Sequence, residues 1–181
     1  MSITYIQRTD EELYQGDIFK DTIFHSLPPS ILILREKEDY LEVLEIEDTP
    51  DAFESSEIIM AHGEKGKVII VSHHCDAQNK PIIQIAPILS IINLPSGQQS
   101  YCRTNKMYNL CYLPENSSVG LEESYINFQL MSFYPVDLLD VSNRIVSLSE
   151  EGINFIHERL LWYFTRKKLQ EISSPLPLDE S

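Results

Sequence analysis

The sequence predicts a single, mainly β domain in which a small curled antiparallel sheet is closed by one C-terminal helix. Short apolar runs bounded by turn residues recur from residue 16 to residue 148, a pattern typical of small barrels and curled sheets. One amphipathic helical pattern follows them. A chain of 181 residues can bury one sizeable core. We therefore expect one domain over residues 1–171 and a disordered tail over 172–181.

Four strands are expected in the first half of the chain. GDIF at 16–19 begins the sheet after a polar lead-in. ILILR at 31–35 and LEVLEI at 41–46 form an inserted hairpin, because the REKEDY segment between them suits a turn. KVIIVS at 67–72 is nearly all apolar, which favours a central strand covered on both faces.

The second half adds further strands and the helix. PIIQIAPILSII at 81–92 is a buried strand, with an edge or a bulge expected at its internal proline, Pro87. SGQQ at 96–99 is expected to be a loop, and strands follow in 107–114, 125–130 and 145–148. Ser149 is a good N-cap for the last element. Its buried stripe is expected to be Ile153, Ile156, Leu160, Leu161 and Phe164, and its C-terminal end to be matched by Arg166, Lys167 and Lys168.

The charge of the chain restricts its partners. The formal net charge is −14, and a field of that sign repels phosphate backbones, which disfavours nucleic acid as a partner. Ten acidic residues and one lysine lie between Glu36 and Glu57. Such a run is usually a solvated surface; it is also a candidate docking face for a basic protein partner.

Cysteine usage and hydropathy give the expected location. Three cysteines without a CxxC pair fit a reducing compartment better than a disulfide framework. No secretory signal is visible at the N-terminus, and no apolar stretch approaches the ~20 residues of a membrane span. We expect a cytoplasmic protein that does not cross a membrane.

The strand at 67–72 ends in SHHCD, Ser72 to Asp76, which holds the main candidate site residues. If the backbone stays extended, His73 and Cys75 share one face and His74 and Asp76 the other. A zinc site on His73, His74 and Cys75 would then need ligands from elsewhere. The candidates for these are Cys102, Cys111, His62 and His25.

Two other interpretations of SHHCD stay open. Cys75 would be a catalytic thiol if His73 acted as its base and Asp76 oriented the imidazole. In the structural interpretation, Cys75 is buried packing, Asp76 accepts backbone N–H groups in a turn, and the histidines form a rim at 72–76 that a protein partner could contact.

Other residues have structural explanations. His157 is expected to be a hydrogen-bonded core histidine on the helix. Trp162 and Tyr163 flank the buried stripe, where they would pack on the barrel or face a homodimer mate. Aromatic residues interleaved with basic ones can stack nucleic-acid bases, but a strand edge explains this group equally well: Tyr101, Tyr108, Tyr112, Arg103 and Lys106.

The order of several motifs resembles the PemK/MazF-like toxin superfamily. These motifs are GDI, a hydrophobic strand ending in serine, API, and the closing segment RIVSLSEEGINFIHERLLWYF. The resemblance spans residues 16–164, with long insertions at 28–64 and 96–122. It implies an SH3-like β-barrel with a capping helix, often a homodimer, and in many members cleavage of single-stranded RNA.

The chain departs from that family at the positions that cut RNA. Where the toxins place an arginine before the VIIVS strand, this chain has Lys65 and Lys67, and lysine lacks the bidentate fork of arginine. The catalytic threonine after API is replaced by Leu89, and Ser90 would point to the opposite face. We therefore expect a non-enzymatic acidic protein-binding component of a toxin–antitoxin or phage-defence system. A diverged endoribonuclease and a thiol- or metal-dependent hydrolase centred on Cys75 are the alternatives.

Overall fold

The computed structural model describes residues 3–25, 31–36, 41–46, 58–60 and 63–167. The chain divides into two compact units. One unit comprises residues 1–22 and 66–181, and the other comprises residues 23–65. The predicted tail at 172–181 lies outside the described residues, so the prediction of disorder there stays a prediction.

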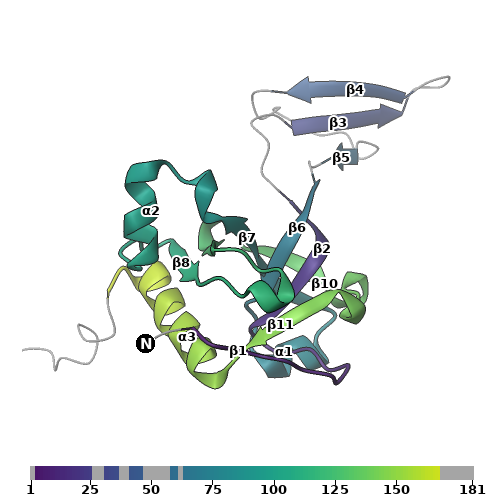
Figure 1. Ribbon diagram of the computed structural model, residues 1–181. Coiled ribbons are helices and arrows are strands. Elements are labelled where there is room, and N and C mark those ends of the chain that lie inside the picture. Colours follow the sequence, from purple (N-terminus) through teal and green to yellow (C-terminus); the bar gives the residue numbers. More distant parts are fainter. Residues whose placement is uncertain (1–2, 26–30, 37–40, 47–57, 61–62, 168–181) are drawn as a thin grey trace, which may run out of the picture. The chain divides into compact units, whose positions relative to one another are not determined.

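An eight-stranded sheet forms the framework (Figure 1). Its strand order is β1-β11-β2-β6-β7-β9-β8, with β10 paired to β7, and the pairings described by register are antiparallel. The predicted mainly β class is confirmed. The strands are β1 (Tyr5–Ile6), β2 (Asp17–His25), β6 (Gly63–Ile70), β7 (Ile82–Ser90), β8 (Leu110–Leu113), β9 (Ser124–Asn127), β10 (Ser132–Pro135) and β11 (Arg144–Leu148).

The predicted closure of the sheet into a barrel is not confirmed. β1 and β8 are the two ends of the strand order, and no pairing joins them among the described strands. A side chain bridges these ends instead, because the Tyr5 hydroxyl donates to the Pro114 carbonyl at 2.7 Å. Burial raises the pKa of Tyr5, as expected for a phenol enclosed between two sheet edges.

Pro87 lies inside β7 and causes no register shift there. It pairs with Val68 of β6. Because proline has no N–H to donate, its backbone nitrogen faces away from that partner. On the other side of β7, β10 pairs with residues 82–85 and β9 with residues 88–90. Pro87 therefore lies in the gap between two partner strands, where its missing donor leaves no acceptor unpaired.

The unit of residues 23–65 contains a three-stranded sheet in the order β4-β3-β5. Its strands are β3 (Ile31–Glu36), β4 (Leu41–Ile46) and β5 (Ile58–Met60). β3 and β4 pair antiparallel from Ile31↔Ile46 to Glu36↔Leu41. The predicted inserted hairpin is confirmed.

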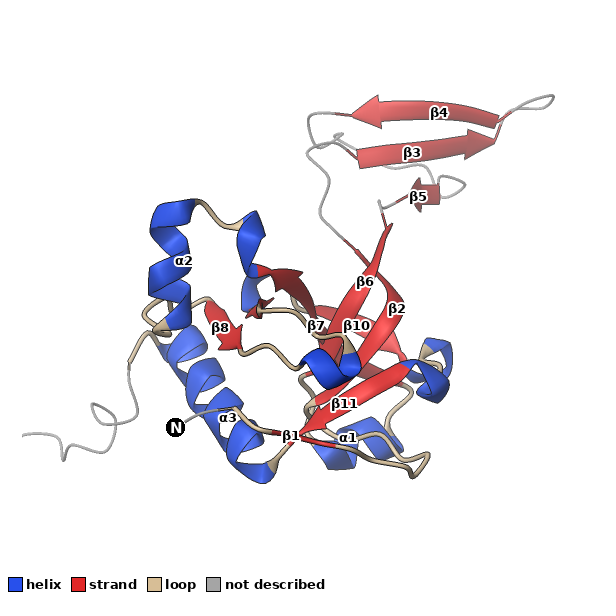
Figure 2. Ribbon diagram, viewed as in Figure 1, coloured by secondary structure: helices blue, strands red, loops and turns tan. Residues whose placement is uncertain are grey.

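The C-terminal helix α3 (Glu150–Thr165) begins where the sequence predicts and lies beside the sheet (Figure 2). Ser149 caps it by accepting from the Gly152 N–H at 3.2 Å, and Ile156 is buried in the main core cluster. The predicted stripe is wrong at Phe164, which is 66% exposed. Arg166 is the left-handed C-cap, and its guanidinium lies 3.8 Å from the Tyr108 ring centroid.

The segment predicted as a loop at 96–99 is helical, which corrects the sequence analysis. α2 (Ser96–Arg103) starts after Pro95, whose carbonyl accepts from the N–H groups of Gln98 and Gln99. Ser, Gly and Gln are neutral to poor helix formers, so tertiary packing decides here. Cys102 of α2 is buried in a second core cluster, which also contains Ile91, Leu110 and Tyr125.

The remaining helices are short. The α-helix α1 (His74–Asn79) follows β6 and carries the candidate site. The 3₁₀ helices are η1 (Ile91–Asn93), η2 (Ser117–Val119), η3 (Phe128–Leu130), η4 (Val136–Leu138) and η5 (Val141–Asn143). No helix among the described residues is long and apolar enough to cross a membrane.

The GDI and RIVSL motifs meet in one buried polar network. Asp17 is fully buried; its carboxylate accepts from Ser147 Oγ at 2.5 Å and from Arg144 Nη1 at 3.0 Å. Gly16 has φ +86, and its added Cβ would lie 3.0 Å from the Cβ of Leu148. These motif residues thus hold β2 to β11, which is a structural role.

Candidate metal centre

The two residues that follow β6, Val71 and Ser72, are held by hydrogen bonds to Gln84. Val71 N and Ser72 N both donate to the Gln84 carbonyl, at 2.9 and 3.3 Å. The Ser72 hydroxyl accepts in return from Gln84 N at 2.8 Å. The backbone that follows therefore starts from a fixed position beside β7.

From His73 onward the backbone turns into a helix, which corrects the expectation of an extended SHHCD segment. His73 is the N-cap of α1, and its Nδ1 accepts from the Cys75 N–H at 3.3 Å. Here a histidine ring nitrogen is the N-cap acceptor, whereas most helices use the side-chain oxygen of Ser, Asp or Asn. The alternation of faces predicted for His73 to Asp76 does not occur.

The turn brings three candidate ligands together. One ligand atom from each of His73, His74 and Cys75 lies within 4.8 Å of the other two, and all three residues are exposed. Cys75 Sγ lies 3.4 Å from His74 Nε2, and the two imidazole centroids are 4.0 Å apart. Because His73 Nδ1 is engaged with the backbone, its Nε2 is the atom left for a metal.

Asp76 is not part of this cluster. Its backbone belongs to the first turn of α1. Its side chain lines a separate pocket with Ser72, Lys80 and residues of β7 and β10. In the described part of the chain, no hydrogen bond joins its carboxylate to a histidine. The Cys75–His73–Asp76 arrangement considered for thiol catalysis is thus not assembled, and the Cys75 thiol lies against His74 instead.

The other cysteines are unavailable as ligands. Cys102 and Cys111 are 1% and 0% exposed, whereas Cys75 is exposed. Burial raises the pKa of Cys102 to about 11 and that of Cys111 to about 12, so both stay protonated thiols near neutral pH. The prediction that Cys75 is buried packing is wrong. The side chains of His25 and His62 lie outside the described residues.

His157 on α3 is paired with Gln15, a partner that the sequence did not predict. Its Nε2 is 2.8 Å from Gln15 Oε1, so the predicted hydrogen bond exists, but the residue is exposed rather than in the core. Partial burial and, secondarily, the charge of His73 lower the pKa of His157. No spacing rule could have linked Gln15, His157 and His73, because 142 residues separate the first two.

Lys67 and Ser90, which the sequence analysis compared with the RNA-cutting residues of the toxins, both lie beside Glu122. Lys67 Nζ lies 3.8 Å from Glu122, and Ser90 Oγ donates to the same carboxylate at 3.0 Å. A carboxylate there repels a phosphate group. This arrangement agrees with the departures from the ribonuclease pattern seen in the sequence.

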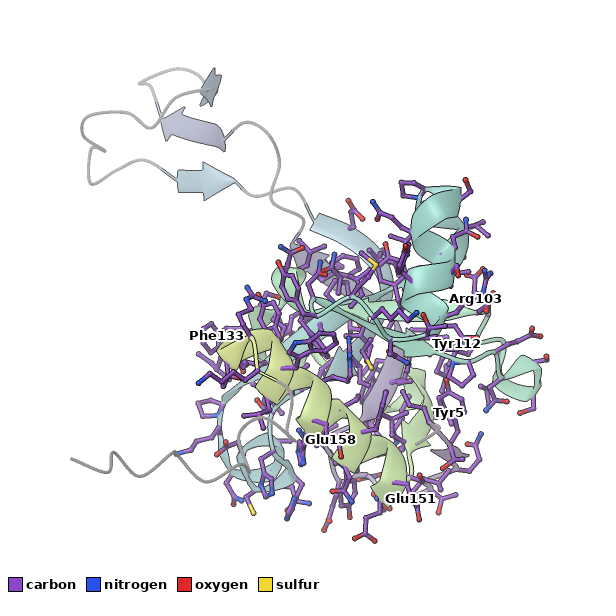
Figure 3. The ribbon with its side chains drawn as sticks, turned by 90° about the vertical axis from the view of Figure 1, so that its left-hand side faces the viewer. Tyr5, Arg103, Tyr112, Phe133, Glu151 and Glu158 are labelled. Carbon is purple, nitrogen blue, oxygen red and sulfur yellow. The ribbon has the colours of Figure 1, made fainter. Side chains whose placement is uncertain are left out.

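Of the residues considered for base stacking, Arg103, Tyr108 and Tyr112 have partners within the fold, whereas Tyr101 is 57% exposed. Arg103 donates to Glu123 through Nε and Nη2, each at 2.7 Å, and the Tyr112 hydroxyl donates to Glu123 at 2.7 Å; Figure 3 shows Arg103 and Tyr112 in the same region. Tyr108 stacks on Tyr163 with centroids 6.4 Å apart. Tyr163 also packs against the main core cluster, and a contact with a homodimer mate at this residue stays a prediction.

The acidic segment at 36–57, a candidate docking face in the sequence analysis, lies largely outside the described residues. A protein partner there, or at the 72–76 rim, stays a prediction, as does a homodimer.

No protein-family model matches the chain, and no curated protein matches it either. The resemblance to the PemK/MazF-like superfamily therefore stays a prediction based on the order of motifs.

Proposed function

We propose that the protein binds a zinc ion through His73, His74 and Cys75. The observation that carries this proposal is the group of three ligand atoms within 4.8 Å of one another. The helical turn removes the objection that adjacent residues on a strand face opposite ways. The function is therefore metal binding at the start of α1.

The donor set selects the metal. Two imidazoles and one thiolate suit zinc and related transition metals, whereas magnesium and calcium prefer oxygen ligands. A bound zinc would hold Cys75 as its thiolate, since a coordinating thiol is deprotonated. His74, 3.4 Å from Sγ, would move only slightly to share the same ion.

Three protein ligands leave one position of a tetrahedral ion to be filled. Water in that position would support the metal-dependent hydrolase considered from the sequence, because zinc lowers the pKa of bound water to about 7. A fourth protein ligand would make the site structural. The identity of the fourth ligand thus decides between catalysis and stabilisation.

The proposal is tested by the metal content of protein purified without a histidine tag. We expect one zinc per chain by elemental analysis, and competition with a chromogenic chelator gives the affinity. Cys75→Ser and His74→Ala should each weaken binding by more than about 100-fold, since loss of an outer-shell partner alone costs ~10–100-fold.

Lys80→Ala is the matched control, because Lys80 is an exposed residue at the C-terminal end of the same helix. It should bind zinc like the unmodified protein. Zinc retained at full affinity by Cys75→Ser, or no zinc bound by the unmodified protein, would exclude the proposed site.

A further inference from the structure

A groove runs between the N-terminal segment at 8–13 and the segment at 136–144. Two cavities form it, of about 390 and 610 Å³, and they adjoin because Glu11 and Val141 line both. Each volume falls within the range of ligand-binding clefts. The helix α1 also lines the smaller cavity, and Figure 1 shows the N-terminal segment, in purple, beside α1. A ligand longer than one side chain can therefore lie across both cavities.

Hydrogen bonds hold the walls of this groove in place. The Arg144 guanidinium donates to the backbone carbonyls of Asp10 and Glu12, which fixes the N-terminal wall to β11. Glu12 Oε2 also accepts from Gln78 Nε2 of α1 at 3.1 Å and from the Tyr14 hydroxyl at 2.7 Å. Because the groove is formed before a ligand binds, less conformational entropy is lost on binding.

The smaller cavity has an apolar floor. Leu13 and Leu139 are each 7% exposed, Ala77 is 1% exposed, and all three line this cavity. The half-buried side chains of Val136 and Val141 line it as well. An apolar ligand side chain on this floor would remove apolar surface from water on both partners, which favours binding.

The rim of the groove is negatively charged. Four exposed carboxylates line it: Asp10, Glu11, Glu12 and Asp140. Arg144 lies 3.8 Å from Asp10 and is paired with the buried Asp17. Within the described part of the chain, no salt bridge engages the other three carboxylates. The second arginine of the lining, Arg8, lies 3.8 Å from the Tyr14 ring centroid. The groove therefore attracts a cationic ligand and repels a phosphate group.

We propose that this groove binds an extended basic segment of a protein partner. One apolar side chain of the segment lies on the floor of the smaller cavity, and its lysine or arginine residues lie along the carboxylates. Successive side chains of an extended peptide supply both kinds of group within a few residues. Nucleic acid lacks the cationic groups and is repelled by the rim. None of the three proposed zinc ligands lines either cavity, so this inference does not depend on the metal.

The experiment is selection of peptides from a phage-displayed library of random heptapeptides on the full chain. We expect enriched sequences that place Leu, Ile or Val close to two or more Lys or Arg residues. A synthetic peptide of the enriched sequence is then measured by fluorescence anisotropy, and its affinity should fall as the salt concentration rises. Glu11→Lys should weaken its binding by at least about tenfold, because a like charge then faces the ligand.

Glu115→Lys is the matched control, since Glu115 is an exposed carboxylate outside the groove and the net charge changes equally. It should bind the peptide like the unmodified protein. Val141→Asn should weaken binding as well, because it makes the apolar floor polar. Enrichment of acidic sequences, no enrichment at all, or equal losses for Glu11→Lys and Glu115→Lys would overturn the inference. Each of these results leaves the zinc proposal untouched.

Discussion

At the scale of single residues, His73 sets the geometry of the proposed metal site. Its Nδ1 accepts from the Cys75 N–H and caps α1, and in this turn one ligand atom from each of His73, His74 and Cys75 lies within 4.8 Å of the other two. The three donor types are visible in the sequence, whereas a cap made by a ring nitrogen is not. The hydrogen bonds of Gln15 were not predictable either, since its partners Val71 and His157 are 56 and 142 residues away.

Asp17 gives the clearest prediction at this scale. Its buried carboxylate pairs with Arg144, whose side chain is 5% exposed. Asp17→Ala leaves that guanidinium without its buried counter-charge, and we expect a loss of about 3–5 kcal/mol in the free energy of unfolding. Urea denaturation measures it.

Asp10→Ala is the control, because Asp10 faces the same guanidinium at 3.8 Å but is 45% exposed. Its removal should cost no more than about 1 kcal/mol. Equal losses in the two variants would mean that burial of the Asp17–Arg144 pair has no special importance.

At the scale of elements, local patterns predicted strands well and short helices poorly. The hairpin of β3 and β4 and the start of α3 were predicted because apolar alternation and a serine cap are local signals. The helices α1 and α2 were missed. Both have few strong helix formers and depend on tertiary contacts, such as the burial of Ala77 and Cys102.

Arg159 provides the prediction at this scale. It is 5% exposed and donates to the carbonyls of Asn105, Met107 and Leu110, so it fastens α3 to the segment entering β8. Arg159→Met leaves these acceptors without their charged donor. We expect a loss of about 3 kcal/mol in unfolding free energy.

Arg103→Met is the matched substitution at a more exposed site, since the Arg103 side chain is 43% exposed. It should cost clearly less than Arg159→Met, because a solvent-exposed ion pair contributes little to stability. Thermal or urea unfolding of both variants makes the comparison, and a cost for Arg103→Met as large as for Arg159→Met would contradict this account of α3.

At the scale of the whole molecule, stability depends on pH through the ionisation of Glu123. Arg103, and secondarily Tyr112, hold the pKa of Glu123 at about 2 instead of 4.5. Between these values the unfolded chain binds this proton more readily than the folded one, so stability from Glu123 falls as the pH drops. The contribution is complete above pH 4.5 and is lost as the pH falls through 2.

Glu123→Gln isolates that contribution. The unmodified protein should be more stable than the variant near neutral pH, and the difference should shrink as the pH falls from 4.5 toward 2. Urea unfolding at several pH values measures it. A difference that stays constant over this range would show that the Glu123 carboxylate is not held ionised by its neighbours.

The mainly β class was predicted from the sequence and is confirmed. The predicted closure of the sheet into a barrel is not confirmed. Alternating strands and a terminal helix define a curled antiparallel sheet. β1, at one end of the strand order, has two residues, and no pairing joins it to β8 among the described strands. The Tyr5–Pro114 hydrogen bond between the edges leaves no local signal in the sequence.

The central claim, a zinc ion held by His73, His74 and Cys75, is tested most directly by X-ray absorption at the zinc edge. The measurement uses untagged protein loaded with one equivalent of zinc. We predict one sulfur neighbour at about 2.3 Å and nitrogen neighbours at about 2.0–2.1 Å, with the sulfur signal absent in Cys75→Ser. A first shell made only of oxygen and nitrogen in the unmodified protein would contradict the account.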